Sequence, residues 1–294
     1  MEQVQWWRGN LPAETNALIG REGEVRRLLK LVADTPLTTV TGAAGVGKSR
    51  IAIRAAWELR DHRPDGAWLV ELSGERDGDL LADTVASVLG LPERSARSQT
   101  EALAGFLAGR RLLLVLDGCE HLLPACRALA AAIVAAAPDV RIVATSRRSL
   151  GLLGEALLPV EPFDVPGPAG LPDPAGSTGP GEPVRGGGPG GPEGNDALRL
   201  FLDRARRVAP GAEPARTTGP AARICRSLGG VPLAVVLAAG GLRTLPPERL
   251  ADLVEGHPCA PSGADAPAAG PVAGPVAGPV AGPVAGPVAG PVAG

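Results

Sequence analysis

The chain has 294 residues, a formal net charge of −2, three phenylalanines, four tryptophans and no tyrosine. Without a basic excess or aromatic platforms, direct contact with nucleic acid or an anionic membrane surface is not expected. The four cysteines form no CxxC pair, Met1 to Asn10 lacks the apolar segment of a signal peptide, and no apolar run could span a bilayer, so we expect a cytoplasmic protein with reduced thiols.

The first half of the chain alternates helical and strand-like patterns. Helices are expected at Glu22–Ala33, Lys48–Arg60, Asp79–Leu89 and Pro124–Ala137, and strands at Leu37–Thr41, Ala67–Leu72, Leu112–Leu116, Val140–Thr145 and Ala156–Val160. Because the strands are almost continuously apolar, they predict a parallel sheet buried on both faces, with sites at the carboxyl ends of the strands. The predicted class is α/β, with flanking helices.

Composition divides the remainder. Residues 164–194 are mostly Gly and Pro and predict a flexible linker between an α/β domain, residues 1–163, and a small all-helical subdomain, residues 195–255. Helices are expected there at Asp196–Val208, Pro220–Leu228, Pro232–Leu242 and Pro247–Val254, the first capped by Asn195. Residues 256–294 predict a disordered low-complexity tail, because its Pro-Val-Ala-Gly repeats can form neither a helix nor a packed sheet.

The clearest motif is Gly42-Ala43-Ala44-Gly45-Val46-Gly47-Lys48-Ser49, which fits GxxxxGK[ST] between a predicted strand and a predicted helix. Its glycines let successive N–H groups turn inward, so that they bind phosphate at the positive end of the helix. Lys48, one of only two lysines, should bridge the β- and γ-phosphates, and the Ser49 hydroxyl should ligate Mg²⁺. Together with Arg50, the loop predicts a P-loop NTPase domain that binds ATP or ADP with Mg²⁺.

Three further residues join Lys48 in the predicted catalytic set. Asp117 ends an apolar strand and should share Mg²⁺ with Ser49, although an ordinary turn at a strand end would have the same pattern. Glu120 could polarise the attacking water, despite lying three positions beyond Asp117. Arg147, at the end of the fourth strand, could sense the γ-phosphate or could be a solvated charge.

A second use of this region would be a zinc site formed by Cys119, His121 and Cys126. These residues lack the usual ligand spacing and a fourth partner, so buried or partly exposed thiols are the expectation.

Several motifs, taken in order, resemble the NB-ARC-like signalling ATPases. They are Asn10-Leu11-Pro12, Ile19-Gly20-Arg21-Glu22, the P-loop, Leu116-Asp117-Gly118-Cys119-Glu120-His121-Leu122, Ala144-Thr145-Ser146-Arg147 and Gly230-Val231-Pro232-Leu233-Ala234. More narrowly, the chain resembles a C-terminally shortened STAND ATPase module of bacterial LuxR-type or SARP-type transcriptional regulators.

The resemblance implies a nucleotide switch, closed with ADP and open with ATP, in which hydrolysis is slow and self-association or another protein partner accompanies activation. It places Ile19 and Gly20 near the adenine, makes Arg147 the γ-phosphate sensor, and closes Pro232 over the nucleotide from the helical subdomain. The chain departs from the family at Gly118, where Asn is usual. It also departs after Val254, where family members continue into a winged-helix domain.

Two functions follow from these residues. The first is a regulatory module with weak, Mg²⁺-dependent ATPase activity; the alternative is a non-hydrolysing nucleotide-binding fragment that acts as a protein-interaction module. A phosphotransferase would share the P-loop, but the sequence shows no constellation for an acceptor substrate.

Overall fold

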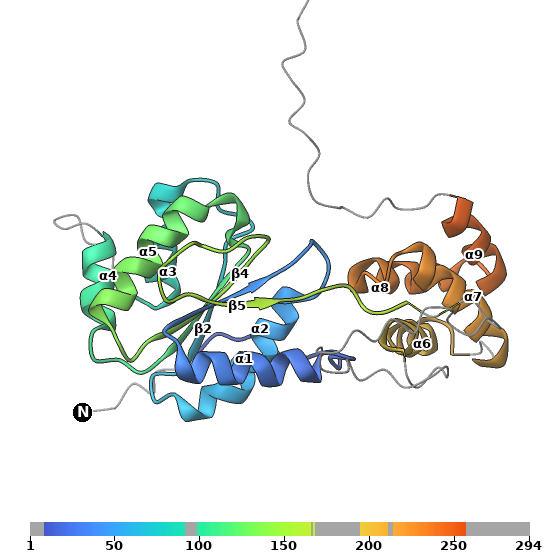
Figure 1. Ribbon diagram of the computed structural model, residues 1–294, viewed down its shortest axis with the longest axis horizontal. Coiled ribbons are helices and arrows are strands. Elements are labelled where there is room, and N and C mark those ends of the chain that lie inside the picture. Colours follow the sequence, from blue (N-terminus) through green and yellow to red (C-terminus); the bar gives the residue numbers. More distant parts are fainter. Residues whose placement is uncertain (1–8, 92–98, 166, 168–194, 211–213, 257–294) are drawn as a thin grey trace, which may run out of the picture. The chain divides into compact units, whose positions relative to one another are not determined.

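The computed structural model describes residues 9–91, 99–165, 167, 195–210 and 214–256 (Figure 1). Most of the predicted linker and all of the predicted tail except Gly256 lie outside the described residues, as does Cys259.

One five-stranded parallel sheet organises the first part of the described chain, in the order β2-β3-β4-β1-β5. The strands are β1 (Leu37–Thr41), β2 (Ala67–Glu71), β3 (Leu113–Asp117), β4 (Arg141–Ser146) and β5 (Ala156–Pro159). Thr41 pairs with Ser146, and Leu116 pairs with Ala144, so β1, β3 and β4 end together at one edge. The predicted buried parallel sheet is confirmed.

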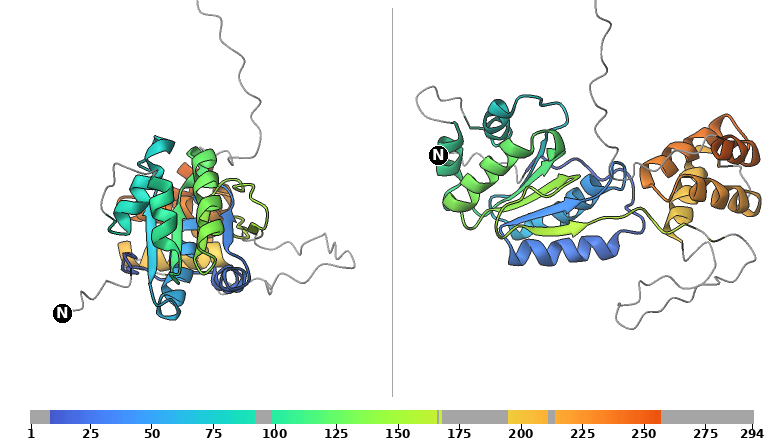
Figure 2. Two further views of the ribbon diagram at one scale, coloured as in Figure 1. Left: turned by 90° about the vertical axis from the view of Figure 1, so that its left-hand side faces the viewer. Right: turned by 45° about the horizontal axis from the view of Figure 1, so that its top comes forward.

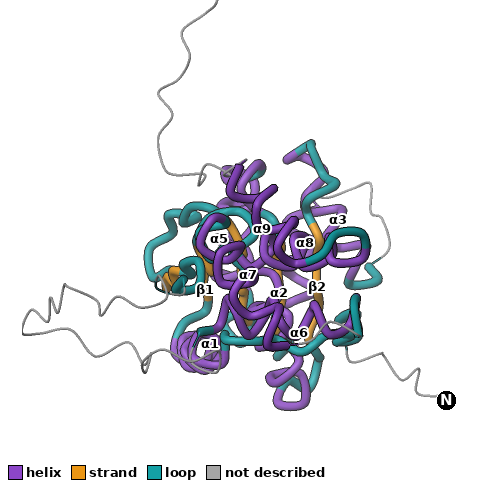
Figure 3. Tube along the Cα trace, turned by 90° about the vertical axis from the view of Figure 1, so that its right-hand side faces the viewer, coloured by secondary structure: helices purple, strands orange, loops and turns teal. Residues whose placement is uncertain are grey.

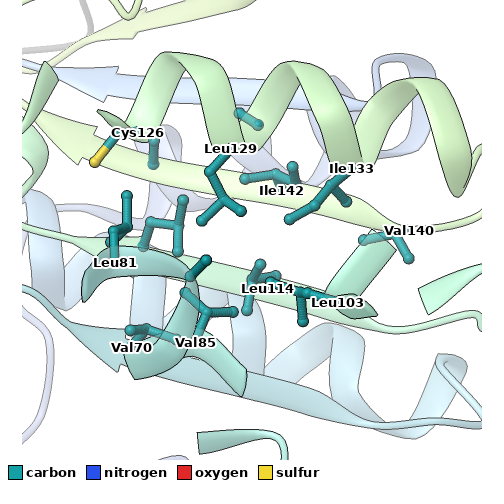
Figure 4. Close-up of a cluster of buried hydrophobic side chains, with 14 of the residues drawn as sticks. Val70, Leu81, Val85, Leu103, Leu114, Cys126, Leu129, Ile133, Val140 and Ile142 are labelled. Carbon is teal, nitrogen blue, oxygen red and sulfur yellow. The ribbon is translucent and has the colours of Figure 1, made fainter. Parts of the chain in front are cut away.

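Helices cover both faces of the sheet. The helices α1 (Glu22–Asp34) and α2 (Lys48–Leu59) lie on one face, and α3 (Leu81–Val88), α4 (Gln99–Leu107) and α5 (Leu123–Ala136) on the other, as Figure 1 and the right-hand view of Figure 2 show. Side chains alternate along each strand: Leu113 and Val115 face α1 and α2, whereas Leu114 and Leu116 face the other layer. In that second layer, Figure 4 shows Leu114 packed among Leu103, Leu129 and Ile142.

The helix α4 was not expected from the sequence. Its apolar stripe is little more than one turn long, since Leu103, Ala104 and Leu107 are its buried residues, and Gly105 lowers the local helix propensity. Burial against α3 and α5, not the local pattern, stabilises this helix.

The helices α6 (Asp196–Val208), α7 (Pro214–Ser227), α8 (Pro232–Gly240) and α9 (Pro247–Gly256) come forward in the view of Figure 3. They share a separate apolar core around Phe201. The Asn195 side chain accepts a 3.0 Å hydrogen bond from the amide of Leu198, which confirms the predicted N-cap. The predicted start of the second helix at Pro220 was wrong, because Pro220 lies inside α7. Burial of Thr217, Ala221 and Ile224 offsets the backbone hydrogen bond that Pro220 cannot make.

Short 3₁₀ turns complete the described elements, at Arg60–His62, Gly78–Leu80, Cys119–His121 and Gly241–Arg243. None of the helices in the described ranges is long and apolar enough to cross a membrane.

Candidate functional site

The candidate site begins with the loop between β1 and α2. Gly42 has a φ of 144°, and a Cβ placed there would lie 2.2 Å from the carbonyl oxygen of Val160, so only glycine fits. Gly47, with a φ of 102°, is the N-cap of α2. The Val46 side chain is fully buried and anchors the middle of the loop. The backbone therefore turns directly into the amino end of a helix, where free N–H groups favour an anion.

Lys48 is the first residue of α2, and its side chain is buried. Its Nζ donates to the carbonyl oxygens of Gly42 at 3.0 Å and Ala43 at 2.9 Å. Burial lowers the pKa of Lys48, Glu120 and Asp117 oppose that change, and the positive charge of Arg147 adds to it. The charges of Asp117, Glu120 and Arg147 therefore all act on the Lys48 ammonium.

Asp117 ends β3 at the carboxyl edge of the sheet. Its Oδ1 accepts a 2.6 Å hydrogen bond from the Thr145 hydroxyl, which in turn accepts from the amide of Gly118 at 2.9 Å. Thr145 is 1% exposed, so this pairing is sheltered from water. Sequence reasoning missed Thr145 as an orienting residue; the available signal was a hydroxyl among the apolar residues at the end of β4.

Glu120 and Arg147 form a loose ion pair beside Asp117. Arg147 Nε lies 3.8 Å from Glu120 Oε1, and the Arg147 side chain is 62% exposed. The other carboxylate oxygen of Glu120, Oε2, is buried without a hydrogen-bond partner among the described residues. This oxygen is therefore available to accept a hydrogen bond from a bound ligand or a water molecule.

The residues predicted to lie near a base are contributed by the segment before α1. Ile19 packs against the core of α6–α9, and a Cβ on Gly20 would lie 2.4 Å from Cγ of Asp196. Pro232 starts α8, and the amide of its neighbour Leu233 donates to the carbonyl of Gly45 in the P-loop at 3.1 Å. The amino end of α8 therefore contacts the P-loop directly.

Arg50, in α2, contacts the segment before α1. Its Nη2 donates to the carbonyl oxygens of Asn16 at 2.9 Å and Ala17 at 3.2 Å. Arg204 of α6 is 8% exposed and donates to the side chain of the same Asn16 at 3.3 Å. Sequence reasoning missed Arg204, because nothing local distinguishes it from its neighbouring arginines.

The site fits a nucleotide and a divalent cation by the chemistry of its donors. It combines the free amides at the amino end of α2 and a buried ammonium for phosphate with the Ser49 hydroxyl and the Asp117 carboxylate, both hard oxygen ligands. At the alternative zinc position, His121 Nε2 contacts the carbonyl of Glu75 at 2.6 Å, and among the described residues no group of three His, Cys, Asp or Glu side chains could hold a metal.

No protein-family model matches this chain. The chain is 36% identical over 225 residues to a Mycobacterium tuberculosis protein provisionally named an HTH-type transcriptional regulator, covering 76% of this chain and 22% of that protein. It is also 36% identical over 235 residues to an uncharacterized protein of the same organism, covering 79% of this chain and 52% of that protein. The chain therefore spans about a fifth of the first of these curated relatives and about half of the second.

A Walker-type ATPase of Pyrococcus abyssi has a similar structure, with a TM-score of 0.50 and 19% sequence identity; the match covers 83% of this chain and 74% of that one. At this identity the likeness shows the fold alone. The chain has a P-loop ATPase fold.

Proposed function

We propose that this chain is a regulatory nucleotide-binding module of the STAND, NB-ARC-like type, which holds ATP or ADP with Mg²⁺ and hydrolyses ATP slowly. The observation that carries the proposal is the buried Lys48 ammonium at the mouth of the P-loop, which donates to the carbonyl oxygens of Gly42 and Ala43. The charges of Asp117, Glu120 and Arg147 act on the same ammonium. The name of one curated relative supports a link to transcription, and we propose that this chain is cytoplasmic.

Each residue has a distinct role in this proposal. The amides of Gly42–Ser49 and the Lys48 ammonium bind the phosphates, and Ser49 and Asp117 hold the cation. When bound, Mg²⁺ neutralises phosphate charge. Arg147 stabilises charge on the γ-phosphate, and Glu120 Oε2 accepts a hydrogen bond from the attacking water.

The division of the chain belongs to the same proposal. Residues 1–163 bind the nucleotide, Ile19 and Gly20 lie beside the base, and residues 195–255 close over it through Pro232. Arg50 positions the segment that lies beside the base, since it donates hydrogen bonds to the carbonyl oxygens of Asn16 and Ala17. Association with a second copy or another protein would follow the change of nucleotide.

Calorimetry with ADP and with ATP, in the presence of Mg²⁺, tests binding. The parent protein and Lys30→Ala should bind, since Lys30 is exposed in α1, whereas Lys48→Ala should lose at least about tenfold in affinity. No heat from the folded parent protein with either nucleotide would overturn the proposal.

Release of inorganic phosphate tests hydrolysis. Slow release that Lys48→Ala abolishes would support the ATPase. Binding without any release would instead favour the second function, a non-hydrolysing nucleotide-binding interaction module, in which the loose pairing of Glu120 with Arg147 persists.

A further inference from the structure

Arg21 is the most heavily engaged side chain of the segment before α1. It is 4% exposed, and its Nη1 donates to Glu24 Oε1 at 2.9 Å. Its Nη2 donates to two backbone carbonyls, that of Val46 at 3.1 Å and that of Glu161 at 2.7 Å. The guanidinium also lies 4.1 Å from the centre of the Phe163 ring. A buried cation with this set of partners fixes several separate segments at once.

These partners belong to parts of the chain that are distant in sequence. Val46 is in the P-loop, whereas Glu161 and Phe163 follow β5. The amide of Phe163 donates to the carbonyl of Gly230 at 3.0 Å, and its ring belongs to the apolar core of α6–α9. Arg21 therefore joins the P-loop to the segment that leads into the helical core.

A second connection runs back from the helical core to the P-loop. Gly230 has a φ of 67°, and a Cβ placed there would lie 2.0 Å from the carbonyl oxygen of Phe163, so the two backbones are in direct contact. Three residues later, the amide of Leu233 donates to the carbonyl of Gly45. The contacts thus form a closed circuit from the P-loop through Arg21, Phe163 and Gly230 to Leu233, and back to the P-loop.

Only arginine can occupy this position with all of its contacts. Its planar fork donates to Glu24 and to both carbonyls while its face covers the Phe163 ring. A lysine would keep the charge, but its compact ammonium could not donate in those directions and stack on the ring at the same time.

We infer that Arg21 is a positioning residue of the phosphate site, which holds the Val46 carbonyl and the 161–163 segment in register, so that the P-loop and the amino end of α8 move as one unit. A rearrangement of the P-loop backbone then reaches the helical core through two paths instead of one. The nucleotide-dependent part of this inference rests on the proposed function; the coupling itself does not.

Amide hydrogen exchange on the ligand-free protein tests the coupling. The two reporters are the amides of Phe163 and Leu233, because their acceptors lie on the circuit. In Arg21→Gln we expect both to exchange at least about tenfold faster, while amides of β3 and β4 stay unchanged. The matched control is Arg27→Gln, since Arg27 faces the same Glu24 at 3.9 Å but is 62% exposed.

Two further variants cover the case in which Arg21→Gln fails to fold. Arg21→Lys should give an intermediate rate at both reporters, and Phe163→Leu should loosen the same two amides while keeping the backbone donor at position 163. Exchange within about twofold of the parent at both reporters would overturn the inference, as would a uniform increase across the whole sheet, which would indicate a role in stability alone.

Addition of ADP with Mg²⁺ separates this inference from the proposed function. In the parent, nucleotide should change the exchange of Leu233; Arg21→Gln should still bind within about tenfold of the parent affinity but lose that change. If the parent binds no nucleotide, the proposed function fails, and the ligand-free reporters still decide the role of Arg21. A nucleotide response of normal size in Arg21→Gln would overturn the inference.

Discussion

The Thr145 hydroxyl donates a 2.6 Å hydrogen bond to Oδ1 of Asp117 and joins the carboxyl ends of two neighbouring strands. The Thr145 hydroxyl oxygen also accepts a hydrogen bond from the amide of Gly118, so a single buried hydroxyl fixes both the direction of the carboxylate and the turn that follows it. The orientation of Asp117 is therefore a property of β4 as much as of β3.

Replacing this hydroxyl should disturb stability and the proposed activity together. Thr145→Val leaves the Gly118 amide and one Asp117 oxygen unpaired, so we expect a loss of about 1–3 kcal/mol in the free energy of unfolding and at least about tenfold slower phosphate release. Urea denaturation and a phosphate-release assay measure the two effects. Thr145→Ser keeps the hydroxyl and is the control; equal behaviour of the two variants would contradict the role given to Thr145.

Gly42→Ala should strongly destabilise the protein. The new Cβ would lie 2.2 Å from the Val160 oxygen at a backbone φ of 144°, so the loop or β5 would have to move at a cost of about 2–4 kcal/mol. Gly23→Ala provides the control, because Gly23 lies in α1 with no atom within 4 Å of a new Cβ, and alanine should add about 0.5–1 kcal/mol there. Chemical denaturation of both variants measures the contrast. Similar stabilities would contradict the steric argument.

Lys48 should contribute to binding at the expense of folding. Burial lowers the pKa of Lys48 from its ordinary value of 10.5. At a pH below 10.5, keeping the ammonium protonated in the folded state therefore costs free energy of folding. At pH 7 we therefore expect Lys48→Met to be no more than about 1 kcal/mol less stable than the parent, while the thermal stabilisation by ADP with Mg²⁺ disappears. Thermal melts with and without nucleotide measure both. A stability loss above about 3 kcal/mol would show that the bonds to Gly42 and Ala43 dominate instead.

Stability should also fall at high pH because of Cys225. Burial raises the pKa of Cys225 to about 12, above its ordinary value of 9.0. The folded state therefore retains a proton that the unfolded state loses, so the contribution is fully present below pH 9.0 and is lost as pH rises toward 12. Urea titrations at pH 8 and pH 10.5 should show a smaller decline for Cys225→Ala than for the parent. An equal decline would exclude this thiol as the cause.

Local patterns were sufficient where neighbouring residues determine the structure. The P-loop lies between β1 and α2 as expected, and Asn195 caps α6, because each depends on residues only a few positions apart. Two local inferences failed: α4 was missed because its apolar stripe is short, and α7 begins before Pro220 because burial outweighs the preference of proline for a first turn.

The sequence by itself determined the sheet-and-helix class and the phosphate-binding motif, since both are written as periodicity and spacing along the chain. Only the tertiary structure decided the strand order, the bond between Thr145 and Asp117, and the contact of Arg21 with Val46. These pairings join residues far apart in the chain. Their formation depends on which surfaces bury together, and no local pattern records that choice.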